Sequence, residues 1–286
     1  MSGCAAVCAE ALEGWAADPL GKVRGTPGVD RHVDSSLPVA ALQRSHDALA
    51  ALVPALTAEQ LTGPAYPAEW TVAQTLSHIG SGAVIGLLNL DAAQAGAPAP
   101  EQSQFVAVWD EWNAKDPQSQ AADAVAADAK LTEAWAGIDP ARIPELTFPL
   151  GPMQLDGTTY LRMRLAELAV HTWDVAVAVD PAAVVEPAAV DQIVDNLEMI
   201  AGFSGRPVGE PGEIVVEVTE PERRFVIAIG EAVTLRPAII GDGPATLTLP
   251  AEAFVRLVYG RLDAEHTPSD VQGEEIERLR KVFPGF

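Results

Sequence analysis

The chain has 286 residues, 48% of them hydrophobic, which is enough for two domains with sizeable cores. It has 18 lysine and arginine residues and 40 aspartate and glutamate residues. The resulting formal net charge of −22 argues against binding to nucleic acid or to an anionic membrane. Both cysteines, Cys4 and Cys8, lie near the start and provide no disulfide framework. We find no signal peptide pattern and no apolar run of membrane-spanning length. We therefore expect a cytoplasmic protein that is monomeric by default.

Residues 1–36 contain several glycines and prolines and are predicted to be a poorly ordered N-terminal extension. A helix is predicted to follow, with Ser36 as its cap and apolar positions from Val39 to Leu56. Thr71 and Gln74 have the spacing of a capping box, which predicts the start of a second helix.

Further helices are predicted around the tryptophans between residues 109 and 135 and across residues 164–174. The loop at 149–153 separates these two regions. Together these segments predict a four-helix bundle.

The second half of the chain has a different pattern. A helix is expected over 188–203, and others over 251–260 and 274–282. Short β-branched runs predict four strands, at 214–219, 224–229, 232–235 and 245–249. We therefore predict a two-domain α+β protein, with a helix bundle over residues 37–185 and a small α+β domain over residues 186–286.

The pair Glu167 and His171 carries the strongest chemical signal. Residues four apart lie on the same face of a helix, where a carboxylate and an imidazole are able to share one metal ion. The neighbouring leucines and valines predict a buried helix, and a buried ionisable group needs a partner. The same spacing also suits an intrahelical hydrogen bond, and a histidine on an apolar face is often a satisfied core residue.

A catalytic zinc site usually has three protein ligands and one open position. His78 is the preferred third ligand, because it lies among apolar neighbours on a separate capped helix. His46 competes with it, although its polar neighbours suggest a half-solvated position. His32 and His266 fall in predicted loops and are not expected to take part. Two histidines and one carboxylate also suit iron or manganese.

Two segments, residues 69–78 with Glu69-Trp70-Thr71-Val72 and residues 164–174 ending in Trp173-Asp174, resemble the signature segments of the mycothiol-dependent maleylpyruvate isomerase family. That family belongs to the wider DinB-like helix-bundle superfamily. The resemblance extends over residues 37–286 and implies a DinB-like four-helix bundle followed by a small α+β, sterol-carrier-like domain.

The resemblance also implies a ligand set of His78, Glu167 and His171 around a divalent metal, with Zn²⁺ preferred. The co-substrate that it implies is mycothiol, a low-molecular-weight thiol. A bound metal deprotonates a thiol, whose ordinary pKa is near 8.5. The thiolate then adds to an electrophilic carbon of the substrate.

Five further residues are given roles. Arg261 is the candidate substrate anchor, because the family uses an arginine of the C-terminal domain to hold a carboxylate, although a cation at a helix end has the same appearance. Asp174 and Arg164 are candidates for supporting the ligands. Asp174 either orients a ligand imidazole or forms a structural ion pair with Arg162 or Arg164, which we favour. Trp70 and Trp173 are expected to pack near the site.

The leading hypothesis is therefore an enzyme that adds mycothiol to a small electrophile such as an unsaturated carboxylic acid. It would act as a thiol S-transferase or as a cis–trans isomerase of the maleylpyruvate type. One alternative is a thiol-independent metal enzyme of specialised metabolism, a hydrolase, isomerase or lyase. The other is a non-catalytic protein that binds a small ligand or a thiol conjugate.

Overall fold

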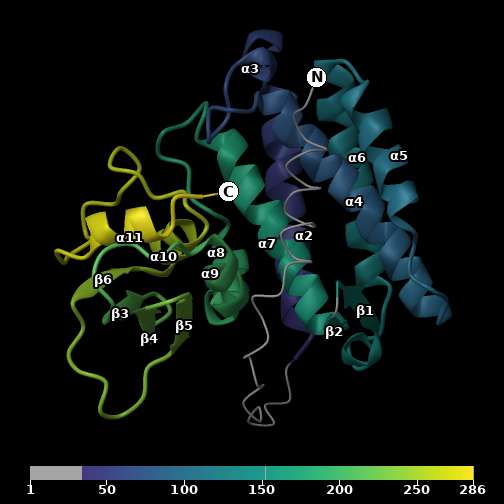
Figure 1. The fold of residues 1–286 in the computed structure, drawn as a ribbon. Coiled ribbons are helices and arrows are strands. Elements are labelled where there is room, and N and C mark those ends of the chain that lie inside the picture. The colour runs from purple at the N-terminus through teal and green to yellow at the C-terminus, as the bar shows by residue number, and fades with distance from the viewer. Residues whose placement is uncertain (1–33, 152, 286) are drawn as a thin grey trace. The chain divides into compact units, whose positions relative to one another are not determined.

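The computed structural model describes residues 34–151 and 153–285. They form two compact units, called here the bundle unit and the sheet unit (Figure 1). The bundle unit ends at Asp180, and the sheet unit begins at Pro181. The predicted α+β fold, a helical bundle followed by a small domain with a sheet, is confirmed. Most of the extension predicted for residues 1–36 lies outside the described residues, as do Cys4, Cys8 and His32.

Four helices make up the bundle, and each is amphipathic or apolar enough to bury one face. They are α2 (Ser36–Leu52), α4 (Val72–Ala95), α6 (Pro117–Ala136) and α7 (Gly157–Ala176). Helices α2 and α4 each pack against both α6 and α7, and α5 (Gln102–Asn113) packs on α4. A short helix, α3 (Ala58–Thr62), precedes α4. The fully buried core side chains of this unit include Leu42, Leu76, Leu131, Trp135 and Trp173.

The helix starts follow local hydrogen-bonding chemistry. The capping box predicted at Thr71 and Gln74 is confirmed at the start of α4. The prediction of Ser36 as the cap of α2 was wrong. The residue before α2 is Ser35, which makes no capping bond because its hydroxyl instead lies 3.0 Å from that of Thr158.

The loop before α7 is a β-hairpin that we did not predict. Its strands are β1 (Thr147–Leu150) and β2 (Met153–Asp156), joined through Gly151, whose φ of 55° suits glycine. Asp156 then caps α7, since its Oδ1 accepts from the backbone amides of Thr158 and Thr159 at 2.9 and 3.0 Å. The hairpin and its cap determine where α7 begins.

A buried polar cluster, called here the Asp128 cluster, links the four bundle helices. Asp128 of α6 is fully buried; its Oδ1 accepts from Nη2 of Arg164 on α7 at 2.7 Å. Its Oδ2 lies 2.9 Å from Nδ1 of His46 on α2. The same Arg164 nitrogen donates to the carbonyl of Ile79 on α4 at 3.2 Å. Each charged group therefore has a partner, as burial requires.

The sheet unit has four strands in the order β5-β4-β3-β6, with β3 and β6 parallel and the other pairs antiparallel. They are β3 (Gly212–Thr219), β4 (Arg223–Ile229), β5 (Val233–Pro237) and β6 (Leu247–Pro250), close to the four predicted strands. Helix α10 (Ala251–Val258) packs on the sheet, where Phe254 stacks on Phe225 with ring centroids 5.2 Å apart. Helix α11 (Ile276–Val282) ends the unit.

The prediction of one continuous helix at the start of this unit was wrong. The segment expected as a single helix over 188–203 forms α8 (Pro187–Ile193) and α9 (Glu198–Ser204), separated by a 3₁₀ turn at Val194–Asn196. Residues on both pieces are buried, including Val190, Ile193 and Ala201. The break redirects the chain so that both short helices bury an apolar side.

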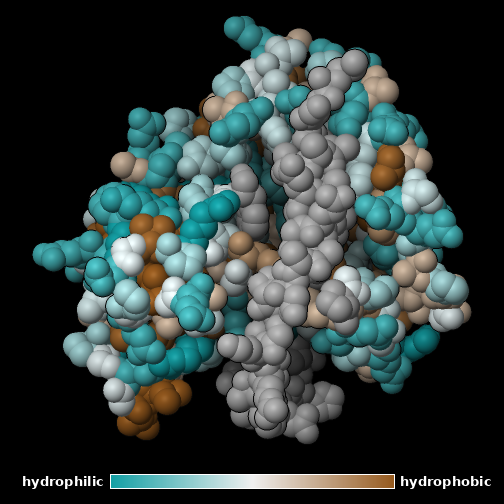
Figure 2. Space-filling view, in the orientation of Figure 1, coloured by the Kyte–Doolittle hydropathy of each residue, from teal (hydrophilic) through white to brown (hydrophobic). Residues whose placement is uncertain are grey.

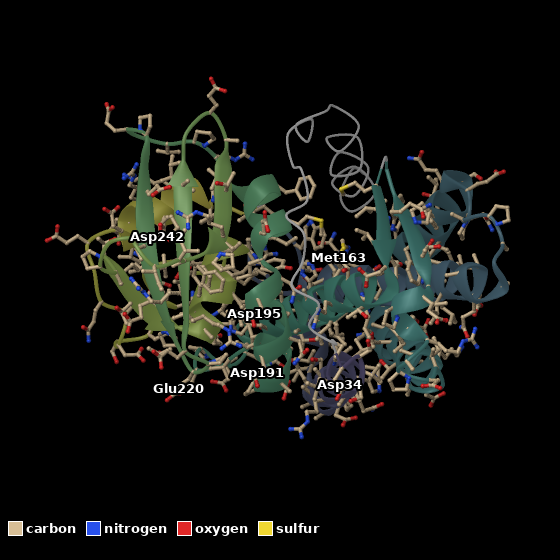
Figure 3. All side chains as sticks on the ribbon, turned by 90° about the horizontal axis from the view of Figure 1, so that it is seen from below. Asp34, Met163, Asp191, Asp195, Glu220 and Asp242 are labelled. Carbon is tan, nitrogen blue, oxygen red and sulfur yellow. The ribbon has the colours of Figure 1, made fainter. Side chains whose placement is uncertain are left out.

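The visible face of the molecule is mostly hydrophilic (Figure 2), as its acidic composition predicts. Two of the acidic residues labelled in Figure 3, Asp195 and Asp242, pair with arginines of the sheet; Asp195 lies 2.8 Å from Arg223. Asp242 pairs with Arg236, which lowers the pKa of Asp242 to about 2. Within the described residues, no helix is long and apolar enough to cross a membrane.

The Asp128 cluster gives a prediction for stability against pH. The contact with Asp128, opposed by partial burial, raises the pKa of His46 above its ordinary value. A raised folded-state pKa stabilises the protein below the unfolded pKa of about 6.5, and this contribution disappears as pH rises through the folded pKa. We expect the difference in unfolding free energy between wild type and His46→Gln to shrink from about pH 6 to about pH 9.

The measurement is chemical denaturation with a chelator present at every pH, so that other histidines contribute equally to both proteins. A difference that stays constant across this range would show that the pKa of His46 is not raised in the folded protein.

Candidate functional site

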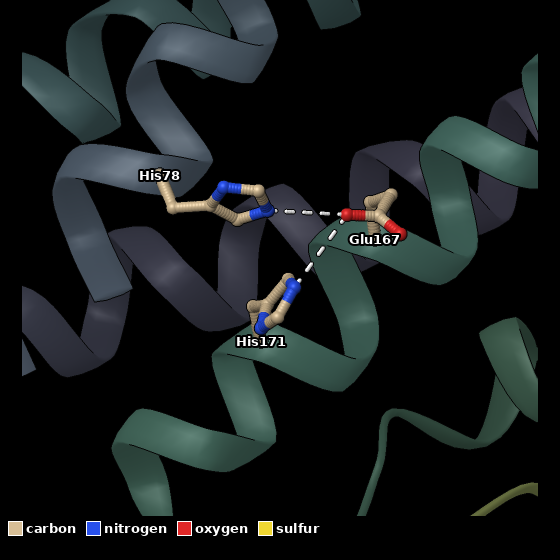
Figure 4. Close-up of side chains that lie close together, drawn as sticks. All are labelled: His78, Glu167 and His171. Atoms are coloured by element: carbon tan, nitrogen blue, oxygen red, sulfur yellow. Dashed lines mark hydrogen bonds and ion pairs between the residues drawn. The ribbon is translucent and has the colours of Figure 1, made fainter. Parts of the chain in front are cut away.

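Helices α4 and α7 bring together the three residues that the sequence singled out. On α7, Glu167 and His171 lie one turn apart, and His78 faces them from the first half of α4 (Figure 4). Oε2 of Glu167 lies 3.2 Å from Nε2 of His78 and 3.5 Å from Nε2 of His171. One carboxylate oxygen is therefore shared between imidazoles from two helices.

The spacing of these atoms suits a single metal ion. Among the described residues, His78, Glu167 and His171 are the group of potential ligands whose ligand atoms all lie within 4.8 Å of one another. Zinc–nitrogen and zinc–oxygen bonds of about 2.0–2.1 Å place tetrahedral ligands roughly 3.3–3.4 Å apart. The two Glu167 distances match that spacing, and the donor set of two imidazoles and one carboxylate fits a catalytic zinc, iron or manganese ion.

The electrostatics favour an ionised carboxylate between the rings. Burial raises the pKa of Glu167, but the contacts with His171 and His78 outweigh it and hold that pKa well below its usual range. The Glu167 side chain is still 45% exposed, whereas those of His78 and His171 are 19% and 13% exposed. The site is thus anionic and open to solvent on the Glu167 side.

A buried carboxylate orients one of the two histidines. Oδ2 of Asp174 lies 2.8 Å from Nδ1 of His171, and Asp174 is 1% exposed. Because an ionised carboxylate only accepts hydrogen bonds, Nδ1 of His171 carries the proton, which leaves Nε2 free as a ligand atom. Of the two roles considered for Asp174, this contact is the one that orients an imidazole.

An aromatic side chain lies beside the ligand atoms. The indole of Trp70 stacks over His171 at 6.5 Å between ring centroids and lies 5.4 Å from the His78 ring. Its loop is held at both ends, because the Ala65 amide donates to the Trp70 carbonyl and the Tyr66 amide donates to that of Asp174. Trp70 therefore forms one side of the site.

Two other residues named from the sequence lie in the Asp128 cluster. His46, considered as a competing ligand, contacts Asp128, and its side chain is only 12% exposed. Arg164, considered as direct support for the ligands or as a partner of Asp174, bonds to Asp128 and the Ile79 carbonyl. Asp128 itself was missed by the sequence reasoning.

Arg261 belongs to the sheet unit, three residues beyond the end of α10. It is buried, and its Nη1 donates to the Tyr259 carbonyl at 2.6 Å. Its own carbonyl accepts from Arg256, whose guanidinium also forks onto Glu252 at 2.7 and 2.8 Å. The backbone turns just before Arg261 at Gly260, where φ is +70° and a Cβ would clash with Gly285.

The bundle unit of this chain matches a known protein family. Residues 42–176 match the family described as the mycothiol maleylpyruvate isomerase N-terminal domain. The matched range contains His78, Glu167 and His171 and ends where α7 ends.

Two similar curated sequences come from Mycobacterium tuberculosis: the uncharacterized protein Rv0738 of strain H37Rv and the uncharacterized protein MT0763 of strain CDC 1551 / Oshkosh. Each is 27% identical over 175 residues, which cover 61% of this chain and 85% of the relative. Among solved structures, the mycothiol-dependent maleylpyruvate isomerase and a histidine-to-alanine mutant of it match with a TM-score of 0.59. The matches cover 80% of this chain and 90% of theirs at 13% identity, which shows that the fold is shared.

The Asp174 contact predicts a change in metal affinity. Replacing a carboxylate that orients a ligand histidine typically weakens metal binding by about 10–100-fold. We expect Asp174→Asn to lower zinc affinity by that order, measured by competition with a chromophoric chelator. Asp263→Asn is the matched control, because Oδ1 of Asp263 also lies 2.8 Å from a histidine Nδ1, that of His266, three residues along the chain. Equal effects of the two substitutions would contradict the assignment, as would no effect of Asp174→Asn.

Proposed function

We propose that this protein is an enzyme that activates mycothiol for addition to an electrophilic small molecule, because residues 42–176 match the mycothiol maleylpyruvate isomerase N-terminal domain family. The observation that carries the proposal is the cluster of His78, Glu167 and His171, whose ligand atoms lie within 4.8 Å of one another. We propose these three as ligands of a divalent metal ion, with zinc preferred.

The donor set explains why a thiol suits this site. A divalent ion held by two imidazoles and one carboxylate supplies a Lewis acid that lowers the pKa of a coordinated thiol. The two cysteines of the chain, Cys4 and Cys8, lie outside the described residues, and we propose that a small molecule supplies the thiol. The open side next to Glu167 gives that molecule access.

The residues of the chain then have separate tasks. Asp174 keeps the Nδ1 proton on His171, so that Nε2 points to the ligand position. Glu167 brings one negative charge into the site, which the two imidazoles stabilise. Trp70 forms an apolar wall beside the rings and limits the access of water from its side.

The proposed reaction is the addition of a thiol to a carbon–carbon double bond that is conjugated with a carbonyl group. The thiol gives up its proton, its sulfur forms a bond to an electrophilic carbon, the carbon–carbon double bond becomes a single bond, and the electron pair moves to the conjugated carbonyl as an enolate. If the thiol remains, the enolate takes up a proton at carbon, the product is a thioether and the enzyme is an S-transferase. If rotation about the single bond precedes elimination of the thiol, the product is the trans isomer and the enzyme is an isomerase.

The first test is calorimetric. We expect zinc to bind at one site per chain, and mycothiol to bind only to the zinc-loaded protein. His171→Ala should abolish both binding events, whereas His266→Ala should preserve both. Zinc-loaded protein that does not bind mycothiol would refute the role of the thiol, and turnover without any thiol would favour metal-activated water instead.

We further propose Arg261 as the residue that binds the substrate carboxylate, because a guanidinium pairs with a carboxylate through two parallel hydrogen bonds. A charged hydrogen bond is worth about 1.5–3 kcal/mol, so Arg261→Gln should raise KM about 10–100-fold for an unsaturated acid. The methyl ester of that acid is the control substrate, and its kinetics should change little. A loss of similar size with acid and ester would assign Arg261 to the structure of its own unit.

A further inference from the structure

Arg164 contacts none of the three proposed ligands, yet it touches the backbone next to one of them. Its Nη2 donates to the carbonyl of Ile79 at 3.2 Å, and Ile79 directly follows His78 on α4. Arg164 itself lies on α7, three residues before Glu167. The side chain therefore spans from the helix that carries two proposed ligands to the helix that carries the third.

A buried carboxylate in the interior of the bundle also holds the guanidinium. The same nitrogen donates to Oδ1 of Asp128 at 2.7 Å, and Asp128 is fully buried. The other carboxylate oxygen of Asp128 is engaged by His46 at 2.9 Å. Asp128 is thus held from α2 and holds Arg164 from α6, so two helices that carry no proposed ligand help to fix the guanidinium between α4 and α7.

Helix α4 has the space that this arrangement needs. Gly82 lies one turn beyond His78, and a Cβ placed there would approach Nη1 of Arg164 to 3.3 Å, tighter than an ordinary contact. A larger residue would push the guanidinium away from α4. Gly82 and the Ile79 carbonyl thus form the part of α4 that the Arg164 guanidinium contacts.

Several polar contacts between described residues join α4 and α7 along their length. His78 meets Glu167 at 3.2 Å, Ile79 meets Arg164 at 3.2 Å, and Asn89 donates to the Tyr160 hydroxyl at 3.1 Å. The Arg164 contact is the one beside the proposed ligands. Metal ligation is sensitive to shifts of a few tenths of an ångström, so the separation of the two helices at this point determines whether three ligand atoms converge.

We propose that Arg164 is a positioning residue, which sets the distance between His78 and the pair Glu167 and His171 through the backbone of α4, with Asp128 as the partner that fixes its guanidinium. The inference rests on the proposed metal site and adds how the bundle shapes that site. It predicts that Arg164 affects metal affinity and coordination geometry separately from its effect on stability.

The experiment compares Arg164→Met with the double variant Arg164→Met/Asp128→Leu. The single change leaves Asp128 as a buried charge without its arginine partner and destabilises the bundle. Replacing both partners by apolar residues removes that buried charge and recovers part of the stability, although His46 then loses its contact with Asp128. Zinc affinity is measured by chelator competition, coordination geometry by the visible spectrum of the Co²⁺-loaded protein, and stability by denaturation of the metal-free form.

We expect both variants to bind zinc about 10–100-fold more weakly than wild type and to change the cobalt spectrum, even where stability is restored in the double variant. Arg164→Lys should recover little affinity, because the lysine nitrogen ends one bond short of Nη2, the single nitrogen that donates to both Asp128 and the Ile79 carbonyl. Phe148→Leu is the control for lost stability alone. Phe148 stacks on Tyr160 towards the other end of α7, so this change should leave zinc affinity and the cobalt spectrum unaltered.

Wild-type affinity and spectrum in the double variant would overturn the proposal and make Arg164 a structural residue only. Weakened zinc binding in Phe148→Leu to the same degree would also overturn it, because affinity would then follow stability. Failure of the wild-type protein to bind zinc or cobalt would instead refute the metal site itself, so the two ideas fail in distinguishable ways.

Discussion

The carboxylate of Glu167 faces imidazoles from two helices, and this shared contact constrains how the bundle packs. His171 reaches it along α7, where the helical repeat alone determines the spacing. His78 reaches it from α4, so its 3.2 Å separation depends on how α4 and α7 pack against each other. The hairpin and the Asp156 cap locate the start of α7, and the capping box at Thr71 locates that of α4. The positions at which α4 and α7 begin, and the way these two helices pack, therefore determine the geometry of the site.

Much of this arrangement was predictable because it is local. The four-residue step between Glu167 and His171 needs only a helix, and the Thr71 capping box places His78 two turns into the next one. The four strands of the sheet unit were found because β-branched runs alternate with turn residues. The cap of α2 was misassigned because Ser35 and Ser36 offer the same chemistry. Only the long-range contact of Ser35 with Thr158 separates them.

The parts that escaped prediction depend on contacts between segments far apart in the chain. Whether His46 or His78 joins Glu167 is decided by helix packing, and the two histidines face different carboxylates. Asp128 left a weak signal, since it shares one face of α6 with Ala124, Leu131 and Trp135, all of them buried. In a run rich in alanine and aspartate, that single aspartate was not distinguished from its exposed neighbours. The partner of Arg164 was missed for the same reason.

Stability alone does not account for a charged cluster at the centre of a helix bundle. Moving a carboxylate and a guanidinium out of water costs several kcal/mol per ion, and an apolar pair of similar volume is often neutral or about 1–4 kcal/mol more stable. Apolar burial, however, is non-directional, whereas a hydrogen bond from Arg164 to the Ile79 carbonyl favours one register of the two helices. A site that requires three ligand atoms to converge from two helices has a reason to keep that register. The polar cluster and the proposed metal site are then two consequences of one requirement, that α4 and α7 meet at a defined separation.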